Sequence, residues 1–385
     1  MRNLIGIFKD KASLIKAALS IKRAAASVHV AVLRATTHNP SAPPSSRRLS
    51  AVLSLGHASP PTAGACIAAI VDRLNATRDA YVALKCLITL HHVVTKGSVV
   101  LKDQLSVYPA VGGRNFLNLS RFRDKRDPET WELSSWVRWY AAVLERNLTV
   151  SRVLGTFLSS ALQRTDDDHR RKTEVSSVLQ ITDGNSRNGE VSSVLQRIDE
   201  NWRNRATTTN LTNENLVRDV DCLVDMVEEI CNAPDSLEYQ RIDLVYELMN
   251  FVGEDYRSTQ YQILVRLGEL GDRIDGLSPS ESAELARSLK RLEGCRERLS
   301  ALFANKKRND AFWDAVGETR ARVVKLEEER ERGKWLVRVG RREEEIESTR
   351  FGERVGRPSQ VLRLPYGGDW LSVDRVHLNI APAVA

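Results

Sequence analysis

The chain has 385 residues, of which 42% are hydrophobic and 28% are charged, a composition that permits a sizeable buried core and excludes wholesale disorder. No apolar run approaches the roughly 18 residues needed to cross a bilayer, and the short apolar stretch near the N-terminus does not match a secretory signal. The five cysteines are scattered without a C-x-x-C pair, so we expect no disulfide framework and no zinc site.

The positive charge is concentrated at one end of the chain. Residues 1–60 carry a net charge of +8, whereas the remainder of the chain sums to −1. This asymmetry indicates an anionic partner for the N-terminal region, either a membrane surface or a nucleic acid, or else a solvated basic face without a partner.

Residues 3–36 contain almost no helix breakers and predict helical structure. At 100° per residue, Leu4, Phe8, Ile15 and Leu19 fall on one side. Three basic residues cluster on another side, namely Arg2, Lys9 and Lys16. The pattern is that of a basic amphipathic helix that lies on lipid, although a surface helix packed on its neighbour gives a similar pattern.

A proline-rich loop follows at residues 37–46 and interrupts the helical pattern. Ser45 or Ser46 can cap the next helix, which places Arg47 and Arg48 in its first turn. Cations at this end oppose the helix dipole, and a phosphate bound to the free N–H groups would reverse that cost.

The rest of the chain also reads as helices without strand alternation. Apolar periodic stretches occur at about 64–76, 79–95, 102–108, 131–161, 211–232, 238–252, 256–274, 279–303 and 309–346. Ser278 is placed to cap a helix that begins with Pro279. The pattern predicts an all-α fold, an α-solenoid of stacked helical hairpins.

A polar segment, 163–208, contains a 16-residue tandem duplication in which Glu174–Gln180 recurs as Glu190–Gln196. We interpret this segment as a linker between an N-terminal part, 1–162, and a C-terminal helical part, 209–303. Residues 304–385 are expected to form a charged helix and a flexible tail.

The sequence offers no candidate catalytic residues and no enzymatic motif: a P-loop, a dinucleotide-binding glycine fingerprint, H-E-x-x-H and G-x-S-x-G are all absent. We therefore expect no enzyme, no cofactor and no metal site. His91 and His92 point about 100° apart on a helix, which predicts one core and one surface histidine. Trp131, Trp136 and Trp139 are expected in the core or packed against the next hairpin, rather than in a ligand cage.

Four motifs resemble those of the ANTH domain of clathrin assembly proteins, in the order of that family. The first is Leu33–His38 with the proline loop and Arg47-Arg48-Leu49. The others are Leu84–His92, similar to "K-x-L-x-x-x-H-H"; Phe116–Lys125, similar to "N-L-S-x-F-x-D"; and Trp136–Glu145, similar to "(I/V)-R-x-Y-x-x-Y-L". The chain most resembles the short-tailed plant members.

This resemblance implies a right-handed α-solenoid that binds phosphatidylinositol bisphosphate and clathrin heavy chain, with vesicle SNAREs as further partners. In the family a lysine before the Ala-Thr pair and a basic cluster after the loop hold the phosphates. Here Arg34 takes the lysine's place, and Arg47 and Arg48 take the last two places of the cluster. We expect Arg2, Lys9 and Lys16 to make auxiliary membrane contacts.

Two departures from the family pattern stand out. Ser45 occupies the place of the cluster's first lysine, and residues 304–385 contain none of the short clathrin or adaptor boxes of long-tailed members. The resemblance implies a peripheral adaptor at clathrin-coated pits and vesicles of the plasma membrane and Golgi. The alternative is a soluble helical scaffold that has lost lipid or clathrin binding. A nucleic-acid binder is not expected, since no recognition motif accompanies the basic end.

Overall fold

The computed structural model describes residues 2–18, 23–39, 42–106, 115–158, 211–235, 242–303 and 306–350. The N-terminal helices are α1 (Arg2–Ala18), α2 (Arg23–Ala35), α3 (Ser46–Ser54), α4 (Pro60–Ala76), α5 (Ala80–Lys96) and α6 (Val99–Ser106), with a 3₁₀ turn at Leu55–His57. The helical stretch expected at 3–36 is thus described as two helices that pack against each other.

The C-terminal helices are α7 (Pro128–Leu154), α10 (Asn213–Cys231), α11 (Asp243–Asp272), α12 (Pro279–Gly294), α13 (Arg296–Leu302) and α14 (Lys306–Arg350), with a 3₁₀ turn at Ile274–Gly276. The described residues contain no strand, which confirms the all-α prediction. The linker at 163–208 and residues 351–385 of the tail lie outside the described residues.

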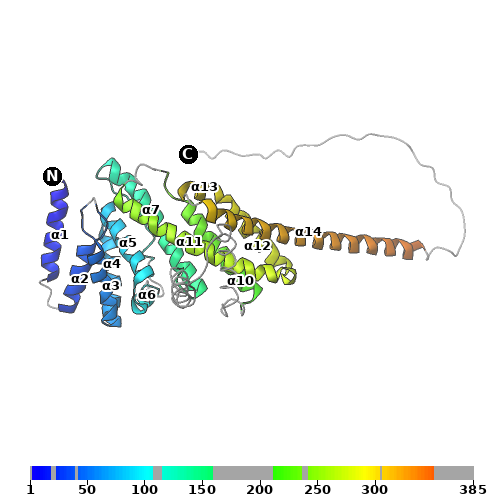
Figure 1. Ribbon diagram of the computed structural model, residues 1–385, viewed down its shortest axis with the longest axis horizontal. Helices are drawn as coiled ribbons and strands as arrows, with labels where there is room; N and C mark the ends of the chain where they lie inside the picture. The colour runs from blue at the N-terminus through cyan, green and yellow to red at the C-terminus, as the bar shows by residue number, and fades with distance from the viewer. Residues whose placement is uncertain are drawn as a thin grey trace, which may run out of the picture. The chain divides into compact units, whose positions relative to one another are not determined.

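The helices form a solenoid because each packs mainly on neighbours in the chain (Figure 1). From the N-terminus, α1 contacts α2, α2 contacts α3 and α4, and α4 contacts α5 and α6. The array continues through α5 on α7, α7 on α10, and α10 on both α11 and α12. The compact unit extends from Met1 to Arg330, and the remaining residues form a separate unit.

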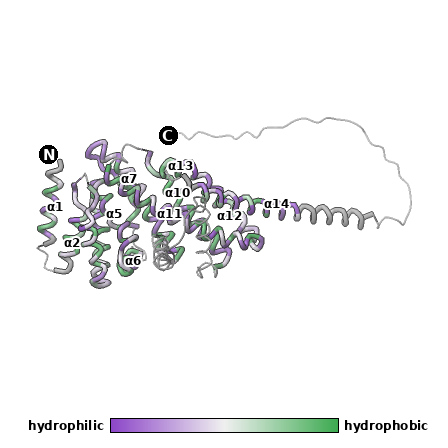
Figure 2. The backbone as a smooth tube through the Cα atoms, in the orientation of Figure 1, coloured by the Kyte–Doolittle hydropathy of each residue, from purple (hydrophilic) through white to green (hydrophobic). Residues whose placement is uncertain are grey.

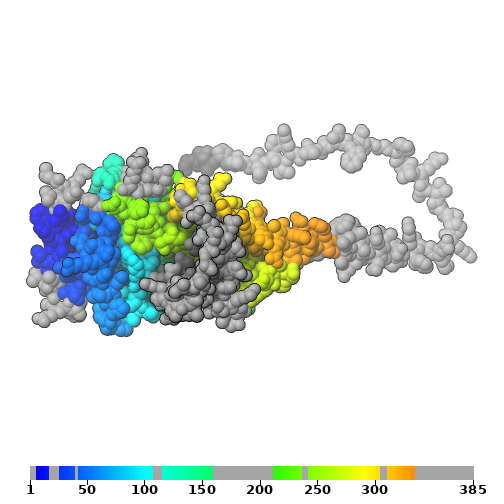
Figure 3. Space-filling model, viewed as in Figure 1, coloured from blue at the N-terminus to red at the C-terminus, as the bar shows by residue number. Residues whose placement is uncertain are grey.

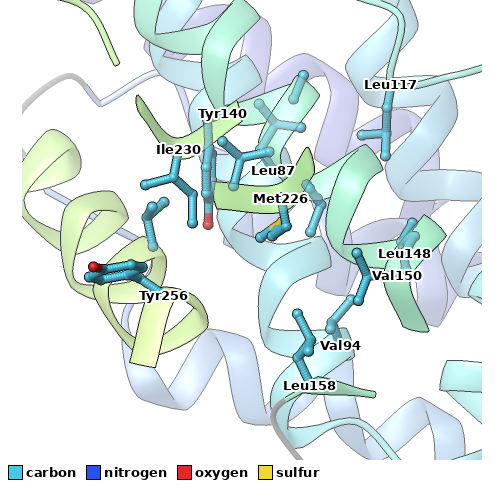
Figure 4. Close-up of a cluster of buried hydrophobic side chains, with 14 of the residues drawn as sticks. Leu87, Val94, Leu117, Tyr140, Leu148, Val150, Leu158, Met226, Ile230 and Tyr256 are labelled. Carbon is cyan, nitrogen blue, oxygen red and sulfur yellow. The ribbon is translucent and has the colours of Figure 1, made fainter. Parts of the chain in front are cut away.

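Helix α5 lies at the centre of this array and is buried on every side from Ala80 to Val94. It is apolar around most of its circumference, as expected of an enclosed helix. Figure 4 shows Leu87 and Val94 among side chains of other helices, including Leu148 and Met226. Elsewhere hydrophobic and hydrophilic residues alternate along the helices, as Figure 2 shows.

Side-chain caps set where several helices begin. Asp79 accepts hydrogen bonds from the backbone N–H groups of Tyr81 and Val82 at the start of α5. Asp127 caps α7 in a capping box, and Ser278 does the same for α12 with Pro279 in the first helical position. The predicted start of α12 is therefore confirmed.

Two expectations about core residues were wrong. His91 and His92 are both buried, because α11 covers α5 and its Phe251 ring contacts both imidazoles at centroid distances of 4.6 and 4.8 Å. Trp136 and Trp139 are buried as expected, whereas Trp131 in the first turn of α7 is 47% exposed. Periodicity within a helix does not show which of its turns a neighbour covers.

The first part of α14 belongs to the compact unit. Phe312, Trp313, Val316 and Val323 are buried, although this helix is dense in arginine and glutamate. The charged segment expected from residue 304 therefore begins as a core helix.

Candidate functional site

The three arginines predicted to bind phosphate flank the connection between α2 and α3. Arg34 lies in the last turn of α2, and Arg47 and Arg48 lie in the first turn of α3. All three side chains are exposed, and within the described residues none of them forms an ion pair. Helices α2 and α3, which carry these three residues, pack against each other.

The N-terminus of α3 lacks a side-chain cap. Ser45 is the N-cap residue with extended backbone, but its hydroxyl forms no capping hydrogen bond, and the first turn contains no acidic residue. Backbone N–H groups at a helix start carry partial positive charge and bind anions. Together with two exposed guanidinium groups, they form a site suited to a phosphate group.

Behind the connection lies Lys85, a buried lysine of α5 that sequence reasoning did not assign to the site. Only 2% of this residue is exposed, and its Nζ donates to the carbonyl oxygens of Thr37 at 3.1 Å and Asn39 at 2.5 Å. Burial, followed by the positive charge of Arg48, lowers the pKa of Lys85 to about 8. Lys85 therefore holds the α2–α3 connection and adds positive charge beneath it.

A second set of polar contacts fixes the same connection to α1 and α4. Asp10 of α1 accepts hydrogen bonds from His38, and Arg73 of α4 contacts both Asp10 Oδ1 at 3.3 Å and the Thr36 carbonyl at 3.1 Å. Burial opposes ionisation of Asp10, but the hydrogen bonds from His38 outweigh it and lower the pKa of this carboxyl. Together with Lys85 of α5, these contacts from α1 and α4 hold the first residues of the connection.

Close approach of the two backbones accompanies this contact. A Cβ atom added to Gly6 of α1 would lie 2.8 Å from Cβ of His38, so a larger side chain here would displace α1 from the connection.

Two of the three auxiliary basic residues are placed by the structure. Lys9 and Lys16 are exposed on α1, whereas the side chain of Arg2 lies outside what the structure describes. Ile7, Phe8 and Ile15 of the same helix are 44%, 68% and 61% exposed. The described part of α1 thus presents apolar and basic side chains to solvent. Figure 3 shows the α1 residues adjoining those of the next helices on the face in view.

Simple signals pointed to the residues that were missed. Lys85 is the single lysine in the mostly apolar stretch from Ala80 to Val94, and Asp10 is the single acidic residue among the first 60. Burying either group requires a partner, which marks both as structurally constrained.

Other kinds of site were searched in the described part of the chain. It contains no group of three or more His, Cys, Asp or Glu residues placed to hold a metal ion. Within the same residues, no helix combines the length and apolarity needed to cross a membrane.

Comparison with known proteins agrees with this architecture. The family model of the ANTH domain matches residues 27–227, which include the α2–α3 connection and Lys85. An Arabidopsis thaliana protein named "Putative clathrin assembly protein At4g40080" is 42% identical over 85% of this chain and 82% of its own length. A second from that plant, "Putative clathrin assembly protein At5g10410", is 32% identical over 87% of this chain and 88% of its own.

Proposed function

The chain belongs to the ANTH-domain family, and on this premise we propose that it is a peripheral membrane adaptor that binds phosphatidylinositol bisphosphate and promotes clathrin coat assembly. Support for the adaptor role comes from the printed names of its relatives, which describe clathrin assembly proteins. The proposal requires no catalytic group.

One observation carries the lipid-binding part of the proposal: Arg47 and Arg48 are exposed and without ion pairs, within the described residues, at a helix start that has no side-chain cap. A phosphate there would contact guanidinium and backbone N–H donors together. Arg34 at the end of α2 and Lys85 beneath the connection add positive charge to the same region.

The strength of the site follows from its charge. Each basic group near an anionic leaflet contributes about 1 kcal/mol, so three arginines give only a few kcal/mol. Additional contacts from Lys9, Lys16 and Arg2 on α1, or several copies on one coat, would then be needed for stable attachment. Weak, reversible binding suits a coat component that must dissociate again.

We extend the proposal to partners and location. Clathrin heavy chain is the expected coat partner, vesicle SNAREs are the expected cargo, and coated pits and vesicles of the plasma membrane and Golgi are the expected sites.

Ser45 favours the second candidate, a helical scaffold that has kept the fold but lost lipid or clathrin binding. Its exposed side chain stands where the family carries a lysine, so the site has one positive charge fewer. The absence of short clathrin boxes in residues 304–385 points the same way.

Vesicle sedimentation tests the lipid site. We expect Arg47→Glu plus Arg48→Glu to abolish binding to phosphatidylcholine vesicles that carry phosphatidylinositol bisphosphate. Arg257→Glu plus Arg287→Glu, which reverses the same charge on α11 and α12, should bind normally. Unchanged binding of the first variant would refute the site. A pull-down of clathrin heavy chain with the whole chain tests the coat partner, and failure there favours the scaffold.

A further inference from the structure

The segment Asn115–Asp127 is held firmly, although it forms neither helix nor strand. The buried carboxylate of Asp124 accepts the backbone N–H of Ala80 at 2.9 Å, and the Asp124 N–H donates to Ser134 Oγ at 2.8 Å. Phe116 and Leu117 are buried in the core. The side chains that this segment exposes therefore have preset positions.

Two arginine side chains meet at one backbone oxygen of this segment. Arg123 Nη1 donates to the carbonyl of Phe122 at 2.7 Å, and Nη1 of Arg138, from α7, donates to the same oxygen at 3.1 Å. Burial, and then the charge of Arg123, lowers the pKa of Arg138. The negative charge of Glu132 acts to raise the pKa of Arg138, but neither Arg123 nor Arg138 forms an ion pair within the described residues.

This arrangement has the chemistry of an anion site. Like charges this close repel each other, and an anion that contacts both would relieve the repulsion. Arg123 Nη1 also donates to the Ser120 carbonyl at 3.1 Å. Each guanidinium still has further N–H donors, and its planar fork matches phosphate oxygens. Arg121 and Lys125 of the segment are also exposed. By contrast, Arg126 is occupied by Asp79 and Asp124.

An exposed aromatic residue lies about two helical turns from Arg138. Trp131 lies seven residues before Arg138, on the same face of α7, and is 47% exposed. Tryptophan is favoured where apolar and aqueous phases meet, as at a lipid headgroup layer.

The segment lies at the same end of the helical stack as the α2–α3 connection. The Asp124 carboxylate accepts a hydrogen bond from the backbone N–H of Ala80, the first residue of α5. Arg126 forms an ion pair at 2.7 Å with Asp79, the residue that caps the same helix. Within the next two turns of α5, Lys85 holds Asn39 of the connection. Figure 1 shows both segments near the end where α5 and α7 begin.

We propose that Arg123 and Arg138 form a second phosphate site, which binds an inositol lipid headgroup in the membrane that the α2–α3 site contacts. This inference rests on the proposed function. Two linked sites bind more tightly than either alone because the second contact becomes intramolecular. They would also set the orientation of the helical stack on the membrane.

The test uses the whole chain and phosphatidylcholine vesicles whose only anionic lipid is phosphatidylinositol bisphosphate. Arg123→Gln plus Arg138→Gln removes two charges and leaves uncharged polar side chains. We expect vesicle affinity to fall about 25-fold, since each basic group contributes about 1 kcal/mol. The matched control, Lys96→Gln plus Arg152→Gln, removes two exposed charges at the opposite ends of α5 and α7 and should bind like wild type.

Soluble ligands distinguish the sources of phosphate. Calorimetric titration with inositol trisphosphate should give two sites in wild type and one in the Arg123/Arg138 variant. Saturation of the second site by inorganic phosphate alone at similar affinity, or by an acidic peptide instead of the headgroup, would overturn the lipid assignment.

Failure of the second site is separable from failure of the proposed function. If Arg47→Glu plus Arg48→Glu abolishes vesicle binding but the Arg123/Arg138 variant matches its control, only the second site is refuted. If the Arg47/Arg48 variant binds normally, the proposed function itself fails. Equal thermal unfolding midpoints of variant and control show that the fold is retained.

Discussion

Asp10 in α1 and His38 in the α2–α3 connection are joined by two hydrogen bonds. The His38 backbone N–H donates to Oδ2 at 2.8 Å, and its ring Nδ1 lies 2.6 Å from Oδ1. This contact couples the position of the basic helix α1 to that of the candidate phosphate site. Arg73 adds a third contact to the same carboxylate.

Replacing Asp10 by Ala should loosen this contact. We expect the free energy of unfolding to fall by about 2 kcal/mol, since a carboxylate with several hydrogen bonds is lost. Binding to phosphoinositide vesicles should fall as well, because the connection would no longer be fixed. Urea unfolding and vesicle sedimentation measure the two effects. Asp103→Ala, in the short helix α6, is the control.

The contribution of Asp10 should also depend on pH. Because its folded-state pKa is lowered, the stabilisation is present above the ordinary carboxyl pKa of 3.8 and is lost as pH falls below that value. The stability difference between wild type and Asp10→Ala should therefore shrink in acid. A difference that stays constant from pH 6 to acid would contradict this role.

Lys85 should make phosphoinositide binding sensitive to alkaline pH. Its pKa is about 8, and a bound anion nearby favours the charged form. Vesicle affinity of the wild type should weaken as pH rises from 7 to 9, whereas Lys85→Met should bind weakly throughout and lack this step. Lys96→Met, at the exposed end of α5, should keep the wild-type profile.

The lowered pKa of Lys85 also makes the free energy of unfolding depend on pH, because burial disfavours the charged form in the folded state. Below about pH 8 the folded state holds a charge that burial disfavours, and this cost disappears as pH rises towards the ordinary value of 10.5. As pH rises from about 8 to 10.5, the free energy of unfolding of wild type should therefore increase relative to that of Lys85→Met. A difference between the two that does not depend on pH would argue against a buried charge.

Ser45→Lys should strengthen vesicle binding. The side chain is exposed and forms no capping hydrogen bond, so its replacement costs little stability. One added positive charge near the leaflet should raise affinity about fivefold. Ser54→Lys, at the other end of α3, adds the same charge away from the site. Equal gains from both variants would show that only net charge matters.

The ionised, buried carboxylate of Asp255 in α11 should destabilise the folded state at neutral pH. Its carboxylate is buried, with Oδ1 3.6 Å from His91 Nε2, and burial raises the pKa of Asp255 to about 7. Since a raised pKa means that ionisation is disfavoured in the folded state, the cost grows as pH rises from 3.8 to about 7. Asp255→Asn should raise the free energy of unfolding by about 2 kcal/mol at pH 8 and change it little at pH 4.5.

Urea titrations at the two pH values measure this effect. Glu284→Gln on α12 is the control, because its side chain is 44% exposed and it pairs with Arg287. A stabilisation of Asp255→Asn that is equal at both pH values would show that shape rather than charge is responsible.

Much of the architecture could be predicted from local patterns. The helical periods, the proline loop and the Ser278-Pro279 start of α12 all depend on residues close together in the chain. The exposure of Arg47 and Arg48 also follows from position, because they stand in the first turn after the loop. The burial of His92 and the exposure of Trp131 could not be predicted, since they depend on which turns of α5 and α7 are covered by neighbouring helices.

Residue order alone was sufficient for the all-α class, for the concentration of basic charge in the first 60 residues and for the position of Arg47 and Arg48 in a first helical turn, because helix period, capping and charge are local properties. The choice of Arg34 as their partner came from the family resemblance. Folding alone decided that Lys85 lies beneath Thr37 and Asn39, and that Arg123 and Arg138 share one carbonyl. These partners are far apart in the chain, and a buried or crowded charge finds its partner only when helices pack.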